Sequence, residues 1–261
     1  MTFVERGGDN GCGGNGLIEA RDLSKVFKHR KRGAVHAVSQ VSFQCQPGQI
    51  YALLGANGAG KTTTLRMLAT ILKPTAGTAT VAGYDILKDS AAVRRNVGFL
   101  STATALYGRL SAREMVEYFG RLNGLKSNAL RQRTDELFDL LEIRAFASRR
   151  CDKLSTGMKQ KVSIARTLVH DPAVMILDEP TIGLDVIAAR TIVHFIRDCR
   201  ERGKTVLFST HVMSEVEKLA DRVGIIHDGR IRAEGTLDEL RERSGERDLE
   251  EIFVKTLGVE A

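Results

Sequence analysis

The segment that decides the fold is residues 50–62, which reads IYALLGANGAGKT. Its first five residues are apolar, as in a buried β-strand, and the turn after them matches the pattern GxxxxGK[ST]. Glycines let backbone N–H groups turn inward around phosphates, and the N-terminus of a following helix adds partial positive charge. About one chain in a hundred of this length would match by chance. The segment therefore predicts a nucleotide phosphate site between a strand and a helix.

The polar residues of this segment have separate predicted tasks. The Lys61 ammonium would reach the β- and γ-phosphates, and the Thr62 hydroxyl would join the coordination shell of Mg²⁺. The helix that follows is predicted to carry Leu65, Leu68, Ile71 and Leu72 on one face and to stop before Pro74. We expect the nucleotide contacts to come from Gly55, Asn57, Gly58, Ala59, Gly60, Lys61, Thr62 and Thr63.

A second candidate element of the site is Asp178-Glu179, directly after the apolar run 173–177. An Asp at the carboxyl end of a buried strand beside a phosphate loop can hold Mg²⁺, and the adjacent Glu can orient or deprotonate an attacking water. An apolar run that ends in two acids is a weak signal by itself, because strand ends often carry charges. Together with the phosphate loop it predicts Asp178 as a metal ligand and Glu179 as a catalytic residue.

Strand-like and helical segments alternate on both sides of the phosphate loop. The runs 174–177 and 206–208 are typical of buried parallel strands, and Ser214 with Glu217 is predicted to cap the helix after the second run. Residues 100–170 read as helical, with a capping box at Ser111 and Glu114. We therefore expect an α/β fold with a mainly parallel sheet flanked by helices and interrupted by a helical subdomain.

The predicted organisation has four parts. Residues 1–16 form a disordered Gly-rich tail, and residues 17–99 with 171–235 form the nucleotide-binding α/β core. Residues 100–170 form the helical subdomain, and residues 236–261 form a C-terminal helical extension. The apolar residues of the extension either pack on the chain's own core or contact a partner chain.

Composition narrows the class of protein. The chain has 261 residues, 43% of them hydrophobic and 27% charged, which excludes a wholly disordered protein. No apolar run approaches the roughly 20 residues that span a bilayer, and the first 16 residues do not resemble a secretory signal. The four cysteines form no CxxC, which argues against a disulfide framework or a zinc module. The net charge of +7 permits a phosphate-rich ligand, an anionic membrane surface or nucleic acid.

Three further motifs give the sequence its resemblance to a family. Residues 154–158 read LSTGM, residues 183–185 read GLD, and residues 209–211 read STH. In this order and spacing, with the phosphate loop and Asp178-Glu179, they resemble the ATP-binding subunits of ABC (ATP-binding cassette) transporters over about residues 17–258. The resemblance implies a phosphate-loop NTPase core of the ABC-ATPase type, which includes an antiparallel β portion and hydrolyses ATP with Mg²⁺.

The resemblance also implies a site shared by two chains. Each ATP would lie between the phosphate loop of one cassette and the Ser155 and Gly157 segment of a second ATP-binding subunit, identical or a paralogue. His211 would contact the γ-phosphate and help to position water, Asp185 would contact the partner cassette, and Phe27 would stack on adenine. The implied location is cytoplasmic and peripheral, on the inner face of the cell membrane, where the chain powers an integral membrane permease subunit.

The sequence departs from the family pattern at two places. The usual LSGGQ is LSTGM here, so Thr156 and Met158 replace a Gly and the Gln. Thr102 stands where the family has another Gln, and its side chain is too short for the same contact with Mg²⁺ and water. Both departures resemble the ABC-2-type exporter branch, which includes sodium-efflux subunits, so the resemblance favours export of Na⁺ or a drug-like substrate.

Two other functions remain as alternatives. An ABC-type ATPase that acts on nucleic acid or ribosomes is compatible with the charge, but such proteins usually carry two cassettes or a long coiled-coil insertion, so no nucleic-acid partner is expected. A phosphate-loop GTPase or small-molecule kinase would leave Ser155 and His211 without a role. The guanine-reading pattern NKxD is also missing, because no Asn in the sequence precedes a Lys.

Overall fold

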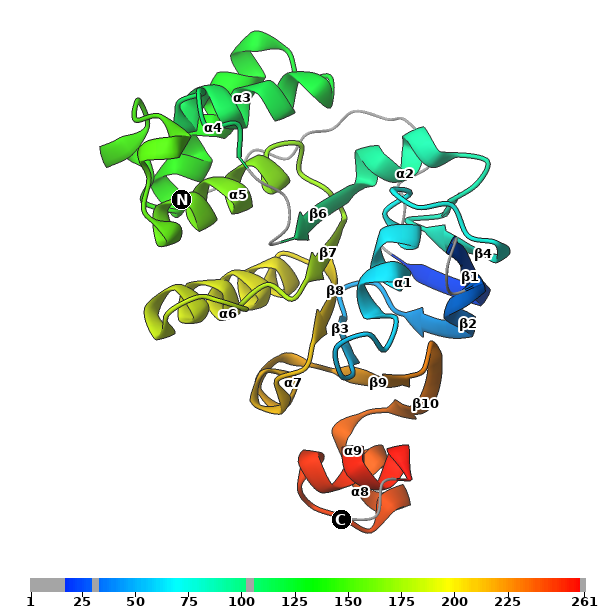
Figure 1. The fold of residues 1–261 in the computed structure, drawn as a ribbon. Coiled ribbons are helices and arrows are strands. Elements are labelled where there is room, and N and C mark those ends of the chain that lie inside the picture. Colours follow the sequence, from blue (N-terminus) through cyan, green and yellow to red (C-terminus); the bar gives the residue numbers. More distant parts are fainter. Residues whose placement is uncertain (1–16, 30–32, 102–105, 259–261) are drawn as a thin grey trace.

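The computed structural model describes residues 17–29, 33–101 and 106–258 (Figure 1). Its centre is a six-stranded sheet in the order β10-β9-β3-β8-β7-β6, in which β9, β3, β8, β7 and β6 run parallel and β10 is antiparallel to β9. The predicted α/β fold with a mainly parallel sheet is therefore confirmed. The strands are β3 Ile50–Leu54, β6 Val97–Ser101, β7 Val174–Asp178, β8 Thr205–Thr210, β9 Arg222–His227 and β10 Arg230–Gly235.

The interiors of the central strands are apolar because both faces of the sheet are covered. In β8, Val206 and Phe208 join one apolar core, whereas Leu207 joins a second core on the opposite face. Side chains alternate between the two faces of a strand, so a strand buried on both sides has no polar position in its interior. Polar residues therefore gather where these strands end, and β7 and β8 end in Asp178 and Thr210.

One face of the sheet packs against α1 and an antiparallel β portion. This second sheet has the order β2-β1-β4-β5 and lies beside α1 in Figure 1. Its apolar residues and those of α1 form one continuous core with Leu207 and Ile176 of the central strands. The elements are β1 Ile18–His29, β2 Gly33–Cys45, α1 Lys61–Leu68, β4 Ala76–Val81, β5 Tyr84–Asp85 and α2 Ser90–Asn96.

Helices α3, α4 and α5 form a group at one end of the sheet (Figure 1). The predicted capping box is present at the start of α3, where the Ser111 hydroxyl accepts from Glu114 N and the Glu114 carboxylate accepts from Ser111 N. The buried apolar residues of α3, α4 and α5 belong to the core on the second face of the sheet. The elements are α3 Ala112–Leu122, α4 Ser127–Leu140, short 3-10 helices at Arg144–Phe146 and Cys151–Lys153, and α5 Thr156–Leu168.

The remaining helices cover the same face as α5. Leu240, Leu249 and Ile252 of the C-terminal extension are buried in this core, so the extension packs on its own chain. The helices are α6 Val186–Glu201, α7 Met213–Leu219, α8 Leu237–Ser244 and α9 Leu249–Leu257. Among the described residues, no helix combines the length and the apolar character that crossing a membrane requires.

Two predicted helix boundaries are wrong. Helix α1 ends at Leu68 rather than near Pro74, because Thr70 takes a left-handed conformation (φ 58°) and the Ile71 N–H bonds back to Arg66 O at 2.9 Å, a Schellman-type ending. Ser214 does not cap α7, which already begins at Met213 and has no side-chain cap from any residue that the structure describes.

Candidate functional site

The phosphate loop connects β3 to α1 through six residues, 55–60. Gly60 precedes the helix with φ 107°, and a Cβ there would lie 2.6 Å from the Ala37 carbonyl oxygen, so only glycine fits. Among the described residues no side chain caps α1, and its first turn holds no acidic residue. The N–H groups at this helix end are therefore available to an anion such as a phosphate.

The Lys61 ammonium lies inside the curve of the loop. Its Nζ donates to the carbonyl oxygens of Gly55 at 2.6 Å and Ala56 at 3.1 Å. It also lies 3.0 Å from Oε1 of Glu179, and the Lys61 side chain is only 4% exposed. The structure thus brings the loop lysine and the predicted catalytic carboxylate together as an ion pair.

A second cluster forms around the Asp178 carboxylate at the end of β7. Oδ1 of Asp178 accepts hydrogen bonds from the hydroxyls of Thr62 and Ser209, each at 2.9 Å. Asp178 is buried, and in the parallel pairing of β7 with β8 it lies opposite Ser209. Mg²⁺ prefers oxygen ligands and usually takes one or two carboxylates together with substrate phosphates, so the adjacent Thr62 and Asp178 oxygens fit this cation.

Glu179 follows Asp178 in a left-handed backbone conformation with φ 47°, which costs a non-glycine residue about 1 to 3 kcal/mol. Its N–H donates to the Ser209 hydroxyl at 3.0 Å, which helps to hold this conformation. Oε1 is buried and makes no hydrogen bond within the described part of the chain, although it pairs electrostatically with Lys61. A carboxylate with one such oxygen can accept a proton from a water molecule.

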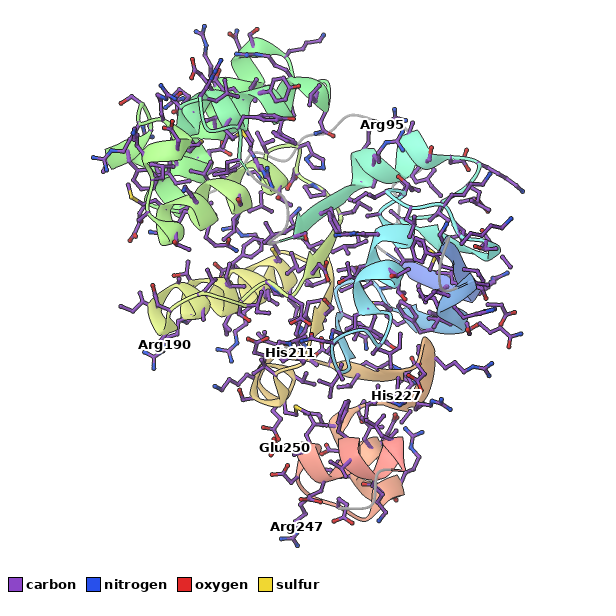
Figure 2. The ribbon with its side chains drawn as sticks, viewed as in Figure 1. Arg95, Arg190, His211, His227, Arg247 and Glu250 are labelled. Carbon is purple, nitrogen blue, oxygen red and sulfur yellow. The ribbon has the colours of Figure 1, made fainter. Side chains whose placement is uncertain are left out.

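His211 completes the cluster from the end of β8, at the junction with α7 (Figure 2). Its Nδ1 lies 2.9 Å from Oε2 of Glu179. An ionised carboxylate only accepts, so Nδ1 of His211 is the donor in this contact. Residues separated by up to 150 positions in the sequence therefore meet at the carboxyl ends of β3, β7 and β8.

The other predicted site residues lie on separate surfaces. Ser155 caps α5 by accepting from Met158 N at 3.3 Å, and Asp185 caps α6 by accepting from Ala188 N at 2.8 Å. Gly157 and Asp185 line a common cavity of about 190 Å³. In the described ranges, no hydrogen bond or ion pair connects Ser155, Gly157 or Asp185 to the phosphate loop.

The remaining predicted contacts differ in their exposure to solvent. Phe27 on β1 is 41% exposed, with the Lys25 ammonium 5.4 Å from its ring centre, and adenine stacking by Phe27 stays a prediction. Asn57 and Gly58 are exposed at the tip of the loop, Ala59 is buried below it, and Thr63 lies in the first turn of α1. Thr102 lies outside the described residues.

Ser209 is a site residue with no role predicted from the sequence. It bonds both to the Asp178 carboxylate and to the Glu179 backbone, and thereby connects the two predicted acids. The available signal was its place at the end of a second buried strand, because the carboxyl ends of parallel strands lie at one edge of a sheet.

This fold and this site define a phosphate-loop NTPase. A protein-family profile described as ABC transporter matches residues 38–182, more than half of the chain. The chain is 41% identical over 242 residues to the ABC transporter ATP-binding protein NatA of Bacillus subtilis (strain 168), covering 92% of this chain and 98% of that protein. It is 37% identical over 245 residues to the doxorubicin resistance ATP-binding protein DrrA of Mycobacterium tuberculosis (strain CDC 1551 / Oshkosh), covering 90% and 74%.

Solved structures agree with this family. A structure described as an ATP-binding subunit of an ABC transporter superposes with a TM-score of 0.82 at 30% identity, covering 92% of this chain and 99% of that one. A dimeric ATP-binding cassette in a post-hydrolysis state with ADP and Pi superposes with a TM-score of 0.76 at 26% identity, covering 84% and 98%. The chain therefore belongs to the ABC transporter family, as an ATP-binding and ATP-hydrolysing subunit.

Proposed function

We propose that the chain binds ATP with Mg²⁺ and powers a separate membrane permease that exports its substrate. The observation that carries this proposal is the cluster at the carboxyl ends of β3, β7 and β8, where Lys61, Glu179 and His211 form one chain of contacts. Thr62 and Asp178 lie beside it as the pair of oxygen ligands proposed for Mg²⁺. The proposed location is the inner face of the cell membrane, where the chain binds as a peripheral subunit.

The contacts of Lys61 suggest how a nucleotide would engage the site. The ammonium would exchange the carbonyl oxygens of Gly55 and Ala56 for β- and γ-phosphate oxygens, which carry more negative charge. This exchange would release Oε1 of Glu179 from its ion pair and free it to accept a proton from the attacking water. Mg²⁺, when bound, would neutralise charge that develops on the phosphates. His211 would hold Oε2 of Glu179 through Nδ1 and donate a hydrogen bond to the γ-phosphate through Nε2, which requires a proton on both ring nitrogens.

The proposed second half of each site comes from another ATP-binding subunit. The first turn of α5 holds no acidic residue, and no described atom lies within 4 Å of where a Cβ of Gly157 would stand, so a γ-phosphate could approach this helix end closely. Asp185 lines the same cavity as Gly157 and would contact the partner cassette. The partner is either an identical chain or a paralogue.

A groove offers a surface for the permease. This groove has a volume of about 760 Å³ and lies between α1, α2, β6, α3 and α5. Exposed Ile71 and Leu122 line it together with Arg94 and Arg95, and Figure 2 shows Arg95 on α2. A partner that places apolar and acidic side chains here would fit both features. The proposed cargo is Na⁺ or a drug-like molecule, and DrrA, a relative named for doxorubicin resistance, supports the outward direction.

The test is an affinity purification of the tagged chain from detergent-solubilised membranes of its own host, followed by mass spectrometry and an ATPase assay. We expect a multi-span membrane protein to co-purify and the complex to release phosphate from ATP. Recovery of ribosomes or nucleic acid without a membrane protein would contradict the proposal.

A further inference from the structure

Glu215, in the first turn of α7, connects the two loops that carry the predicted catalytic residues. Its Oε2 accepts from the Thr210 hydroxyl at 2.8 Å, and its Oε1 accepts from the Thr181 hydroxyl. Thr181 belongs to the loop after β7 and Thr210 is the last residue of β8. One half-buried carboxylate therefore binds a hydroxyl from each loop.

Both hydroxyl donors lie next to the proposed chemistry. Thr181 is two residues after Glu179, in the turn closed by the Ile182 N–H and the Glu179 carbonyl oxygen at 3.3 Å. Thr210 directly precedes His211, and its carbonyl oxygen accepts from Gly55 N at 3.3 Å, at the first residue of the phosphate loop. A displacement of either threonine would therefore change the geometry around Glu179 and His211.

Glu215 is placed to resist such a displacement. Glu179 has a strained left-handed backbone, so its loop needs contacts beyond the preceding strand to keep this conformation. Helix α7 is anchored independently, because Val216 and Leu219 are buried in the core. The carboxylate is thus fixed to the core and can hold the loops through charge-assisted hydrogen bonds, which are stronger than neutral ones.

We propose that Glu215 is a positioning residue for ATP hydrolysis. Its carboxylate joins the loops after β7 and β8, so that the Glu179 carboxylate and the His211 ring stay within hydrogen-bonding distance. This inference rests on the proposed roles of Glu179 and His211. It assigns Glu215 no contact with the nucleotide, so ATP affinity should not depend on it.

The test compares Glu215→Ala, Thr181→Val and the double variant with wild type in phosphate release and in binding of a fluorescent ATP analogue. Misplaced catalytic groups cost up to about 10²-fold, so we expect kcat to fall roughly 10- to 100-fold for Glu215→Ala, with KM and analogue affinity unchanged. Thr181→Val removes the same contact, so the double variant should lose no more than Glu215→Ala does. Glu215→Gln keeps one oxygen as an acceptor, and its kcat should lie between wild type and Glu215→Ala.

The matched control is Glu217→Ala, which truncates an exposed glutamate on the same helix and should keep wild-type kcat. Wild-type kcat in Glu215→Ala, or losses that multiply in the double variant, would overturn the inference and leave the proposed function intact. If Glu215→Ala fails to fold, Thr181→Val decides, since wild-type kcat in that variant would also overturn it. Absence of ATP hydrolysis by the wild-type protein would overturn the proposed function and this inference together.

Discussion

The carboxylate of Glu179 has two different environments at its two oxygens. Oε2 contacts His211, whereas Oε1 is buried beside the Lys61 ammonium and lacks a hydrogen bond from any described residue. A buried carboxylate oxygen without a hydrogen bond is costly unless a charge compensates for it, and here Lys61 supplies that charge. When the Lys61 ammonium moves towards a phosphate, Oε1 of Glu179 loses its compensating charge. A water molecule that gives up a proton to Oε1 would then be a suitable new partner.

The first prediction concerns this oxygen. Glu179→Gln should lower the rate of phosphate release by about 10² to 10⁴, because an amide oxygen cannot accept the proton of the attacking water. ATP binding should survive, since Lys61 and the loop N–H groups are unchanged. Single-turnover phosphate release and nucleotide binding measure the two effects separately. Turnover close to wild type would remove Glu179 from the role of base.

The second prediction concerns Ser209, which bonds to both acids. Ser209→Ala removes a hydrogen bond from Asp178 and leaves the Glu179 N–H without its acceptor, so the free energy of unfolding should fall by about 1 to 3 kcal/mol. Loss of a residue that orients a metal ligand typically costs 10- to 100-fold, so the Mg²⁺ concentration for half-maximal ATPase activity should rise by roughly that factor. Urea denaturation and an Mg²⁺ titration check these values. Ser214→Ala, an exposed serine on α7, is the control, and equal effects in both variants would contradict the role of Ser209.

At the residue scale, the sequence predicts contacts within one segment better than contacts between segments. The phosphate loop follows from local composition, because its glycines and Lys61 act within six residues of one another. Ser209 bonds to Asp178 across 31 positions and Glu215 to Thr181 across 34. Those contacts depend on β8 lying next to β7, and no local pattern specifies which strands are neighbours.

At the scale of elements, apolar runs predict the central strands because burial on both faces removes their polar residues. Helix ends are harder to predict. Ser214 has the residue type of a cap, but the entry to α7 depends on Thr210, whose hydroxyl accepts from Val212 N at 3.0 Å and donates to Glu215. Similarly, Thr70 ends α1 by adopting a left-handed conformation that is usually taken by glycine or asparagine.

The third prediction concerns His170, which follows α5. His170 lines the groove proposed for the permease and contacts β6 through Val97. Burial lowers the pKa of His170 below its usual value of 6.5, while its Nε2 lies 3.2 Å from the Val97 carbonyl oxygen. Because the folded pKa is lower than the unfolded one, the folded state binds fewer protons, so this stabilisation is complete above pH 6.5 and is lost as the pH falls through the folded pKa. The melting temperature should therefore fall on acidification in wild type, and less in His170→Gln, which keeps an N–H donor.

The control for this measurement is His194→Gln, which removes an exposed histidine from α6 and should melt with the same pH dependence as wild type. Parallel melting curves for wild type and His170→Gln at every pH would show that protonation of His170 does not contribute to acid destabilisation.

At the scale of the whole molecule, the predicted nucleotide contacts fall into two groups. The phosphate loop, Asp178, Glu179 and His211 meet at the edge of the central sheet, whereas Ser155, Gly157 and Asp185 lie around another cavity. A nucleotide held by both groups would need two chains arranged head to tail. ATP would then stabilise the dimer, and hydrolysis would release it, since a ligand shifts an equilibrium by its differential affinity for the two states.

The last prediction tests this arrangement through Gly157. A Cβ at this position would meet no atom of the described part of the chain within 4 Å, so Gly157→Phe should fold normally and bind ATP at its own phosphate loop. In the Glu179→Gln background, where ATP persists, light scattering should detect an ATP-dependent dimer that Gly157→Phe abolishes, because the ring would fill the space proposed for the partner's γ-phosphate. Arg131→Phe adds the same ring on an exposed face of α4 and should dimerise like the parent. An ATP-dependent dimer of undiminished affinity in the Gly157 variant would place the second half of the nucleotide site elsewhere on the chain.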